Sequence, residues 1–244
     1  MLVLAKGRYQ ARLAQTPNEV QAAQALRHLC FVAARGLGAG GGLDGDAFDA
    51  ASQHMLVTDR DGTLVCCWRM QVFADGAGVR GGYSARHYDL TRLAGFTAPL
   101  VEMGRFCIHP DHHDPDILRV AWGAMTRFVD DNGIGMMFGC TSFLGADPAL
   151  HAPALRHLAQ RHVAPDRWAP LPMAAETVAL ADLPPVAPHP ARVPPLLRTY
   201  LLMGGWISDH AVIDRQMDTL HVFTGVEVSA VPPARARALR ELAG

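Results

Sequence analysis

The sequence has few charged residues, a single lysine and no long apolar run. Charged side chains make up 18% of the 244 residues, below the roughly 25% of a typical soluble domain. The formal net charge of −1 and the single lysine, Lys6, give no indication of a nucleic-acid partner. No apolar run approaches the ~20 residues of a membrane span, and the opening MLVLAKGRYQ is too short and polar for a signal peptide. We therefore expect a cytoplasmic protein, with any membrane contact peripheral to the inner membrane.

Cysteine is scarce, and its spacing indicates no covalent framework. The five cysteines include no C-x-x-C pair, and their number is odd. This argues against a disulfide framework and against a zinc-finger site. A chain of this length can bury a full core without such supports, so we expect reduced and mostly buried thiols. The cysteines are Cys30, Cys66, Cys67, Cys107 and Cys140.

Glycine is concentrated in the segment GLGAGGGLDGDAFDA, residues 36–50. These glycines do not follow a predicted strand, and neither G-K-[ST] nor G-x-G-x-x-G before a helix is present. A nucleotide-binding loop is therefore disfavoured, and disorder or a mobile lid is the expectation for this segment.

Turn and cap signals divide the chain into strands and helices. Thr16, Pro17 and Glu19 match the start of a capping box, and an Asp-Pro helix start occurs at Asp114 and again at Asp147. The Asp-Gly in DRDG predicts a hairpin turn. Strands are predicted over 2–15, in a hairpin over 54–73, and over 101–109, 134–143, 206–214 and 219–228. Helices are predicted over 16–36, 114–133, 147–162 and 195–205.

This order predicts a single α/β domain over residues 1–244, with a mixed central sheet and helices on both faces. Residues 164–195 are rich in proline and are predicted to form an extended excursion over the surface. Residues 232–244 are predicted to form a basic terminal helix or tail.

The segment VEMGRFCIH, residues 101–109, carries two charged residues in an apolar strand. In a regular strand Glu102 and Arg105 point to opposite faces, unless Gly104 between them marks a bulge. Two buried charges cost several kcal/mol each unless they are paired. The strand therefore holds either a structural ion pair or a functional site, and the spacing alone does not decide between them.

The segment HPDHHD, residues 109–114, follows this strand. The favoured interpretation is a strand-to-helix turn with Asp114 as N-cap. A metal site is a second reading, which a solvated turn disfavours. A third is the H-x-x-x-x-D motif of glycerolipid acyltransferases, matched by His109 and Asp114, in which the aspartate orients a histidine base. Cys107 with His109 could also form a thiolate–imidazole pair, although Cys107 fits a core position. We expect no bound metal.

Several segments together resemble the GNAT-type N-acyltransferases of ornithine lipid biosynthesis. The resemblance covers roughly residues 20–225, and the matching segments occur in family order: FDAASQHMLVTD, CWRM, GYSARHYDL, VEMGRFCIHPDHHD, MFGCTSFLGADP and PPLLRTYLLMGGWISDHAVIDRQMDTLHVFT. It implies a GNAT-like acyltransferase fold and transfer of a 3-hydroxyacyl group from acyl carrier protein to the α-amine of an amino acid. It implies no separate cofactor, because the acyl group arrives on the phosphopantetheine of the carrier protein. Phe106 and the segment RQMDT depart from the family pattern, so glutamine stays an alternative to ornithine as acceptor.

Two other functions remain open from the sequence. The strand 101–109 also resembles that of acyl-homoserine-lactone synthases, which share a Glu and an Arg in this strand, an Arg at the end of the preceding strand, here Arg69, and an upstream acidic stretch. The segment LLRTYLLMGGWISDHAVID argues against that family. The other alternative is a non-catalytic acyl-carrier-binding module, against which the retention of Glu102 argues.

The resemblance gives the charged residues candidate roles. The acceptor's ammonium must lose a proton before it attacks a thioester, and Glu102 is the first candidate for the base. Its alternative role is to support Arg69 or Arg105 by an ion pair. These two arginines are expected to hold the acceptor's carboxylate, or to act as structural salt bridges.

Other residues are expected to contact the substrates. Backbone N–H groups of the strand after Gly104 are expected to bind the thioester oxygen and the pantetheine amides. Asp49 and His54 lie in the matching segment FDAASQHMLVTD and are expected to border the acceptor pocket. Ser142 lies in a matching segment but lacks the G-x-S-x-G elbow of a nucleophile. The expected substrate-binding residues are Arg69, Asp49, His54, Phe106, Cys107, Ile108 and Ser142.

Acyl carrier protein is the expected partner. Ordinary coenzyme A acetyltransferases carry an R/Q-x-x-G-x-G/A pyrophosphate loop, and HHDPDILRV stands in its place here. The carrier protein is acidic, so Arg119 and Arg127 are candidates for its docking face, with a merely solvated face as the alternative. Three arginines of the C-terminal segment could favour an anionic membrane surface, or could only increase solubility. They are Arg235, Arg237 and Arg240.

Overall fold

The computed structural model describes residues 3–38 and 41–244, and the chain forms two compact units. Unit 1 consists of Met1–Val72, Met103–Ile134 and Pro233–Gly244, and unit 2 of Phe73–Glu102 and Gly135–Pro232. Strand β6 (Leu100–Ile108) leads from unit 2 into unit 1 between Glu102 and Met103. The assignment of residues 1–244 to one domain stays a prediction.

The sheet of unit 1 has the strand order β1 (Val3–Lys6), β2 (Tyr9–Leu13), β3 (Gln53–Thr58), β4 (Leu64–Phe73) and β6. The first four strands pair antiparallel. The single strand predicted over 2–15 is wrong, because Gly7, with a φ of 63°, turns the chain into the β1–β2 hairpin. The hairpin predicted at DRDG is confirmed between β3 and β4, where the Gly62 amide donates to the Asp59 carbonyl at 3.2 Å.

Helix α1 (Pro17–Phe31) begins as the sequence predicts. The Glu19 amide donates to the Thr16 hydroxyl, and the Glu19 carboxylate accepts from the Thr16 amide, which completes the capping box. The helix ends at Phe31 and not at Gly36. Gly36 instead adopts a φ of 68° after the 3-10 helix Ala33–Arg35.

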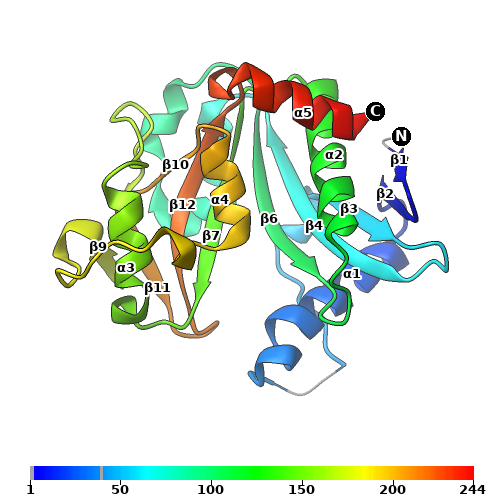
Figure 1. Ribbon diagram of the computed structural model, residues 1–244, viewed down its shortest axis with the longest axis horizontal. Helices are drawn as coiled ribbons and strands as arrows, with labels where there is room; N and C mark the ends of the chain where they lie inside the picture. Colours follow the sequence, from blue (N-terminus) through cyan, green and yellow to red (C-terminus); the bar gives the residue numbers. More distant parts are fainter. Residues whose placement is uncertain (1–2, 39–40) are drawn as a thin grey trace. The chain divides into compact units, whose positions relative to one another are not determined.

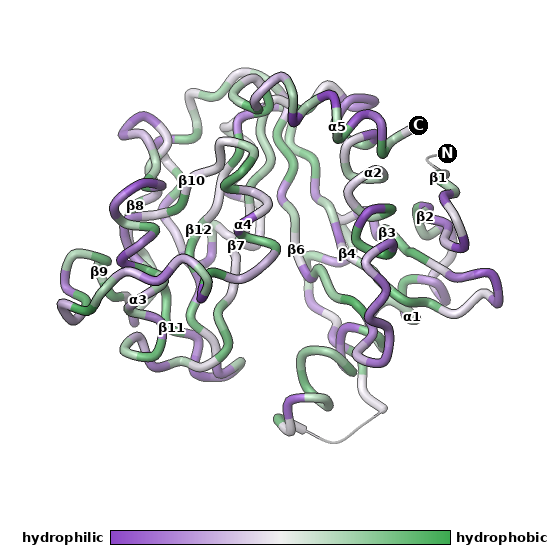
Figure 2. Tube along the Cα trace, viewed as in Figure 1, coloured by the Kyte–Doolittle hydropathy of each residue, from purple (hydrophilic) through white to green (hydrophobic). Residues whose placement is uncertain are grey.

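Two helices cover opposite faces of the unit 1 sheet. Leu26 of α1 packs with Leu56 and Cys67 on one face. The neighbours of Leu56 in β3, Met55 and Val57, are fully buried and point to the other face, where α2 (Pro115–Asp131) packs (Figure 1). The C-terminal segment forms helix α5 (Pro233–Ala243), which packs on α2, and hydrophilic and hydrophobic residues alternate along it (Figure 2). The helices that the sequence predicts on both faces are thus confirmed in this unit.

The sheet of unit 2 has the order β6, β7 (Met136–Leu144), β12 (Thr219–Glu227), β11 (His210–Asp214) and β9 (Thr177–Ala179), with β10 (Trp206–Ile207) also paired to β12. β6 and β7 are parallel and the other pairs antiparallel, so the mixed sheet is confirmed. The strand predicted over 206–214 is two strands, because Ser208 interrupts it: its hydroxyl donates to the His210 carbonyl at 2.6 Å. β5 (Tyr88–Asp89) and β8 (Leu171–Pro172) form a separate pair.

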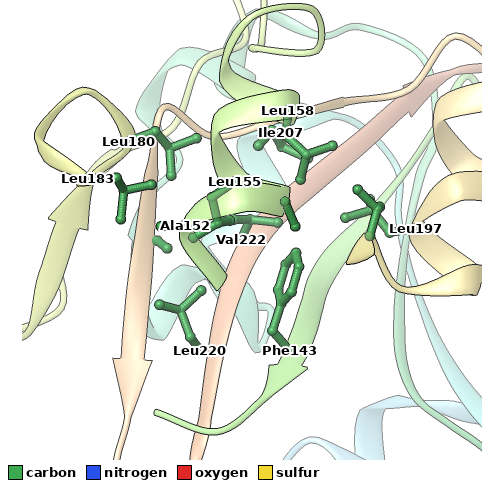
Figure 3. Close-up of a cluster of buried hydrophobic side chains, with 13 residues drawn as sticks. Phe143, Ala152, Leu155, Leu158, Leu180, Leu183, Leu197, Ile207, Leu220 and Val222 are labelled. Atoms are coloured by element: carbon green, nitrogen blue, oxygen red, sulfur yellow. The ribbon is translucent and has the colours of Figure 1, made fainter. Parts of the chain in front are cut away.

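Apolar side chains pack on both faces of the unit 2 sheet. On one face α3 (Pro148–Ala159) and α4 (Pro195–Leu202) cover Phe143, Leu220 and Val222 (Figure 3). On the other face residues of the segment 73–96 pack against Phe138 and Phe223. The candidate site residues of unit 2 lie on this second face.

The proline-rich excursion over 164–195 is more integrated than the sequence predicts. It supplies β9, which pairs with β11 at the edge of the sheet, and it buries Leu180, Leu183 and Val193 against α3. The apolar residues between the prolines explain the difference, because their burial anchors the segment. Within the described residues, none of the helices combines the length and the apolar character that crossing a bilayer needs.

Candidate active site

Glu102 is a buried carboxylate at the end of the part of β6 that belongs to unit 2, with 5% of its surface exposed. Its Oε1 accepts hydrogen bonds from the Ser84 amide at 2.6 Å and the Ser84 hydroxyl at 2.5 Å, and its Oε2 accepts from the Tyr83 amide at 2.8 Å. The three donors come from two adjacent residues and bind both carboxylate oxygens. The carboxyl group of Glu102 is therefore held in a fixed orientation.

The segment 81–86 is shaped to receive this carboxylate. The 3-10 helix Ser84–Arg86 begins after Tyr83, so the amides of Tyr83 and Ser84 have no acceptor within the helix itself. Gly82 lies against Oε2 of Glu102, and a Cβ atom at this position would collide with that oxygen. Glycine at 82 thus permits the close approach of the backbone.

Ser84 also connects Glu102 to strand β7. Its hydroxyl lies 3.4 Å from the Cys140 thiol. Cys140 shares a face of β7 with Phe138, the residue that pairs with Glu102 in the parallel ladder. Sequence reasoning did not select Ser84 or Cys140, although both lie within segments that match the acyltransferase family.

A second group of charged residues lies in unit 1 and centres on Asp49. Its Oδ1 accepts from Arg27 at 2.8 Å and from Arg69 at 2.7 Å, and its Oδ2 accepts from Gln24 at 2.8 Å. Burial alone would raise the pKa of Asp49, but the bonds from the two arginines outweigh it and hold that pKa well below its usual range. His54 donates through Nε2 to the Asp49 carbonyl at 3.1 Å, and burial lowers the pKa of His54. The centre of the group is thus a set of ionised, mutually paired side chains beside a neutral histidine.

The outer part of the same group is more exposed. Arg69 binds Asp46 through two bonds of 2.5 and 2.9 Å, and Arg105 approaches Asp44 at 3.0 Å and Asp46 at 3.5 Å. Arg27 also binds Asp44, at 2.9 Å. Three arginines and three aspartates therefore balance in formal charge. We call this set the Asp–Arg cluster: Arg27, Asp44, Asp46, Asp49, Arg69 and Arg105.

The unit 1 sheet brings three of the expected site residues together. His54 of β3 pairs with Arg69 of β4, so both side chains point to the face that α1 covers. Arg105 of β6 reaches the same aspartates from the next strand. The acidic residues in the second half of the glycine-rich segment are thereby anchored, whereas Ala39 and Gly40 of the same segment lie outside the described residues. Arg27 was missed, and its one sequence signal is a charged residue directly after Leu26 in the apolar stripe of the helix.

The expected irregularity of β6 is present, but at Arg105 and not at Gly104. Arg105 has a φ of 56°, the left-handed region that side chains with a Cβ seldom adopt. A left-handed residue is typical of a β-bulge. The bonds to Asp44 and Asp46 offset the strain at this position.

The three residues after Arg105 have different surroundings. The Phe106 ring lies 5.7 Å from the ring of Trp68. The Cys107 thiol is buried 3.6 Å from that of Cys67; a hydrogen bond from Cys30 lowers its pKa, but the Cys67 contact and burial raise it well above its usual value. Cys107 is therefore a core thiol. The carbonyl of Ile108 accepts from Cys30 at 3.4 Å. The expected binding of a thioester by the amides of residues 106–108 stays a prediction.

Ser142 lies on unit 2, exposed on β7, and pairs with His221 of β12. His221 is buried, and its Nδ1 lies 3.0 Å from the hydroxyl of Tyr88, which also reaches the His221 carbonyl at 2.9 Å. Sequence reasoning missed this histidine–tyrosine pair, because the two residues are 133 positions apart. The contact of Ser142 with a substrate stays a prediction.

The segment HPDHHD forms the turn that the sequence favours. Asp114 caps α2 by accepting from the Asp116 amide at 2.9 Å, and its second oxygen accepts from Arg8 at 2.5 Å and Tyr9 at 3.1 Å. His109 instead contacts the Asp111 amide at 3.3 Å. The bonds of Asp114 thus support its role as a cap and not as a partner of His109. Across residues 3–38 and 41–244, no group of three His, Cys, Asp or Glu side chains is arranged to hold a metal ion.

Comparisons with known proteins agree with this architecture. The model of the acetyltransferase (GNAT) domain family matches residues 26–123. The L-ornithine N(alpha)-acyltransferase of Rhodobacter capsulatus is 30% identical over 237 residues, which cover 91% of each chain. The enzyme of the same name from Brucella abortus is 32% identical and covers 89% of this chain and 83% of its own.

Similarity to solved structures extends over nearly the whole chain. The N-acyl amino acid synthase FeeM from uncultured soil microbes superposes with a TM-score of 0.52 at 12% identity, covering 97% of both chains. At that identity the likeness concerns the fold alone. Together with the family model that matches residues 26–123, it confirms the GNAT-type fold that the sequence resemblance implies.

Proposed function

The chain belongs to the L-ornithine Nα-acyltransferase family, and we propose that it transfers a 3-hydroxyacyl group from acyl carrier protein to the α-amino group of ornithine. The protein is an acyltransferase of the GNAT type. The observation that carries the proposal is the buried Glu102 carboxylate, held by Ser84 and Tyr83. A protein that only binds an acyl carrier has no need of a buried negative charge on this strand.

In the proposed reaction Glu102 removes a proton from the ammonium group of the acceptor, directly or through a water molecule. The resulting amine attacks the thioester carbonyl carbon, so that a C–N bond forms. The C–S bond then breaks, and the phosphopantetheine thiolate leaves and takes up the second proton of the attacking nitrogen, while Glu102 releases the first to water. No acyl-enzyme forms, because the amine attacks the thioester directly. The amides of Phe106, Cys107 and Ile108 are proposed to stabilise the negative oxygen of the intermediate.

Arg105 is the better of the two arginines for binding the acceptor's carboxylate. The Arg69 side chain is 5% exposed and donates two bonds to Asp46, whereas that of Arg105 is 21% exposed and has longer contacts with its aspartates. We assign Arg69, Asp49 and His54 to positioning. Asp46, with a quarter of its side chain exposed, is suited to the side-chain ammonium of ornithine, which glutamine lacks.

Acyl carrier protein is proposed as donor because of the start of α2. In coenzyme A acetyltransferases the loop before this helix binds pyrophosphate. Here the Asp114 carboxylate already accepts from the Asp116 amide, and Asp116 adds a second negative charge. Two carboxylates at this helix start disfavour a pyrophosphate there.

Charge supports two proposed roles for surface arginines. Arg119 and Arg127 are exposed on α2, where they also approach Asp116 and Asp131, and they remain the proposed docking residues for the carrier protein. On α5, Arg240 pairs with Asp130, which leaves Arg235 and Arg237 as the proposed contacts with an anionic membrane surface.

The test is to incubate the purified protein with 3-hydroxyacyl-loaded acyl carrier protein and a panel of amino acids with S-adenosylmethionine. Mass spectrometry is expected to detect N-acylornithine. A glutamine adduct would change the acceptor, and a lactone would identify a homoserine-lactone synthase. Binding of the carrier protein without any product would support the non-catalytic module instead.

A further inference from the structure

His221 lies on the face of the unit 2 sheet that carries Glu102. It pairs with Ser142, and the next residue on its face, Phe223, pairs with Cys140. Cys140 contacts Ser84, which binds Glu102. Paired residues of neighbouring strands share a face, so one surface of the sheet carries His221, Ser142, Phe223, Cys140 and Glu102.

The contacts of Tyr88 determine which nitrogen of His221 carries the hydrogen. The Tyr88 hydroxyl lies 2.9 Å from the His221 carbonyl oxygen and 3.0 Å from its Nδ1. A carbonyl cannot donate, so the single phenolic proton lies between the two oxygens. Nδ1 must then hold a hydrogen and donate it to the tyrosine oxygen. Nε2 is left as a lone-pair acceptor.

This acceptor is buried without a protein donor. His221 is 2% exposed, and among the described residues no group donates a hydrogen bond to its Nε2. Burial, together with the neighbouring His87, lowers the pKa of His221 to about 3, so the ring is neutral near pH 7. A neutral imidazole of such low basicity suits a neutral donor, such as a hydroxyl, better than an ammonium group.

His221 is surrounded by aromatic rings, and two of its neighbours reach solvent. Tyr88 stacks edge-on with Phe223 at 5.6 Å, which provides an apolar floor. The His87 ring lies 5.0 Å from that of His221, and both His87 and Ser142 reach solvent. The buried acceptor nitrogen thus belongs to a ring that neighbours aromatic side chains and two residues that reach solvent.

We propose that His221 determines donor specificity by accepting, through Nε2, a hydrogen bond from the hydroxyl group of the transferred acyl chain. The proposal rests on the proposed function, because that function supplies a hydroxylated chain. The amide N–H groups of phosphopantetheine are a second source of the same donor chemistry, and matched acyl donors distinguish the two sources.

The test compares 3-hydroxydecanoyl and decanoyl acyl carrier protein with ornithine. His221→Phe is expected to lower kcat/KM for the hydroxylated donor about 10- to 100-fold and to leave that for decanoyl within about twofold. His221→Gln, whose amide oxygen can replace Nε2 as acceptor, is expected to recover most of the loss. An equal loss with both donors, as a pantetheine contact or a structural role would give, overturns the proposal. No loss with either donor also overturns it.

A second measurement needs no turnover. Nitrogen-15 NMR of histidine-labelled protein is expected to show His221 with a protonated Nδ1 and a bare Nε2 near neutral pH. Adding 3-hydroxydecanoic acid is expected to shift the Nε2 resonance, whereas decanoic acid is not. A protonated Nε2, or equal responses to both acids, contradicts the proposal. If the wild-type protein acylates no ornithine, the proposed function fails, and this measurement alone decides the role of His221.

Discussion

At Glu102 a single side chain combines burial, charge and three hydrogen-bond donors. Glu102→Gln keeps the shape of the side chain and removes the base. We expect kcat to fall about 10²- to 10⁴-fold, with little change in KM for the acyl donor. Steady-state kinetics with loaded carrier protein measures both constants.

The matched control is Glu176→Gln, at an exposed carboxylate that pairs with Arg215. We expect wild-type kinetics from this variant. Full turnover by Glu102→Gln would eliminate Glu102 as the base while leaving the family assignment intact. A thermal melt accompanies both variants, because a structural role would lower the melting temperature in parallel with activity.

Arg27 supports a prediction about stability, since it forms ion pairs with Asp44 and Asp49 of the Asp–Arg cluster and its side chain is 1% exposed. Arg27→Met removes one positive charge from between Asp44 and Asp49. We expect the free energy of unfolding in urea to fall by about 3–5 kcal/mol, the cost of leaving buried charge uncompensated.

The comparison for Arg27 is Arg215→Met, which breaks an exposed ion pair with Glu176. An exposed pair contributes at most about 1 kcal/mol. Equal losses in the two variants would show that the Asp–Arg cluster does not depend on Arg27.

At the scale of the elements, a carboxyl group in the first turn of α1 is expected to make the stability of the protein depend on pH. The Arg12 side chain and the Gln15 amide lower the pKa of Glu19 from 4.5 to about 2. A carboxyl group with a lowered folded-state pKa stabilises the protein above its unfolded pKa and loses this effect as the pH falls toward the folded value. In Glu19→Gln we therefore expect unfolding free energy to depend less steeply on pH between about 4.5 and 2. Urea titrations across this range measure the slope, and an unchanged slope would refute the coupling.

The elements also show which signals a sequence carries. The start of α1 at Thr16, the start of α2 at Asp114 and the turn at Gly62 were all predicted, because each depends on hydrogen bonds between near neighbours. The β1–β2 hairpin at Gly7 and the strand β9 were not. Both depend on which strands pair with each other, and the local sequence pattern does not specify that pairing.

The candidate site divides in the same way. Motif resemblance selected Glu102, Arg105 and Asp49, whose residue types the chemistry requires. Sequence reasoning did not identify Ser84 or Arg27, because their roles depend on partners that only the fold brings close.

At the scale of the whole molecule, segments from both ends of the chain complete unit 1. The Lys6 side chain donates to the Glu241 carbonyl at 3.2 Å, and Gly123 of α2 lies against Leu242 of α5. Strand β1 and helix α5 accordingly lie near each other (Figure 1). The two ends of the chain therefore stabilise one another's packing.

Leu239→Ala tests this arrangement, since Leu239 is the buried leucine of α5. We expect a loss of about 2–5 kcal/mol in unfolding free energy. Leu202→Ala, at a leucine that is 65% exposed on α4, is the control and is expected to change it by less than about 0.5 kcal/mol. A negligible effect of Leu239→Ala would mean that α5 adds nothing to the stability of unit 1.

The order of the two units along the chain also determines which surfaces are exposed while the protein is being synthesised. α2 lies within Met103–Ile134, whereas α5, which packs on it, follows the whole of Gly135–Pro232. During translation of that long segment, the surface of α2 that α5 covers stays open to water. Exposed apolar surface on a nascent chain attracts chaperones and other unfinished chains. The yield of folded protein should therefore depend on how fast residues 135–232 are translated.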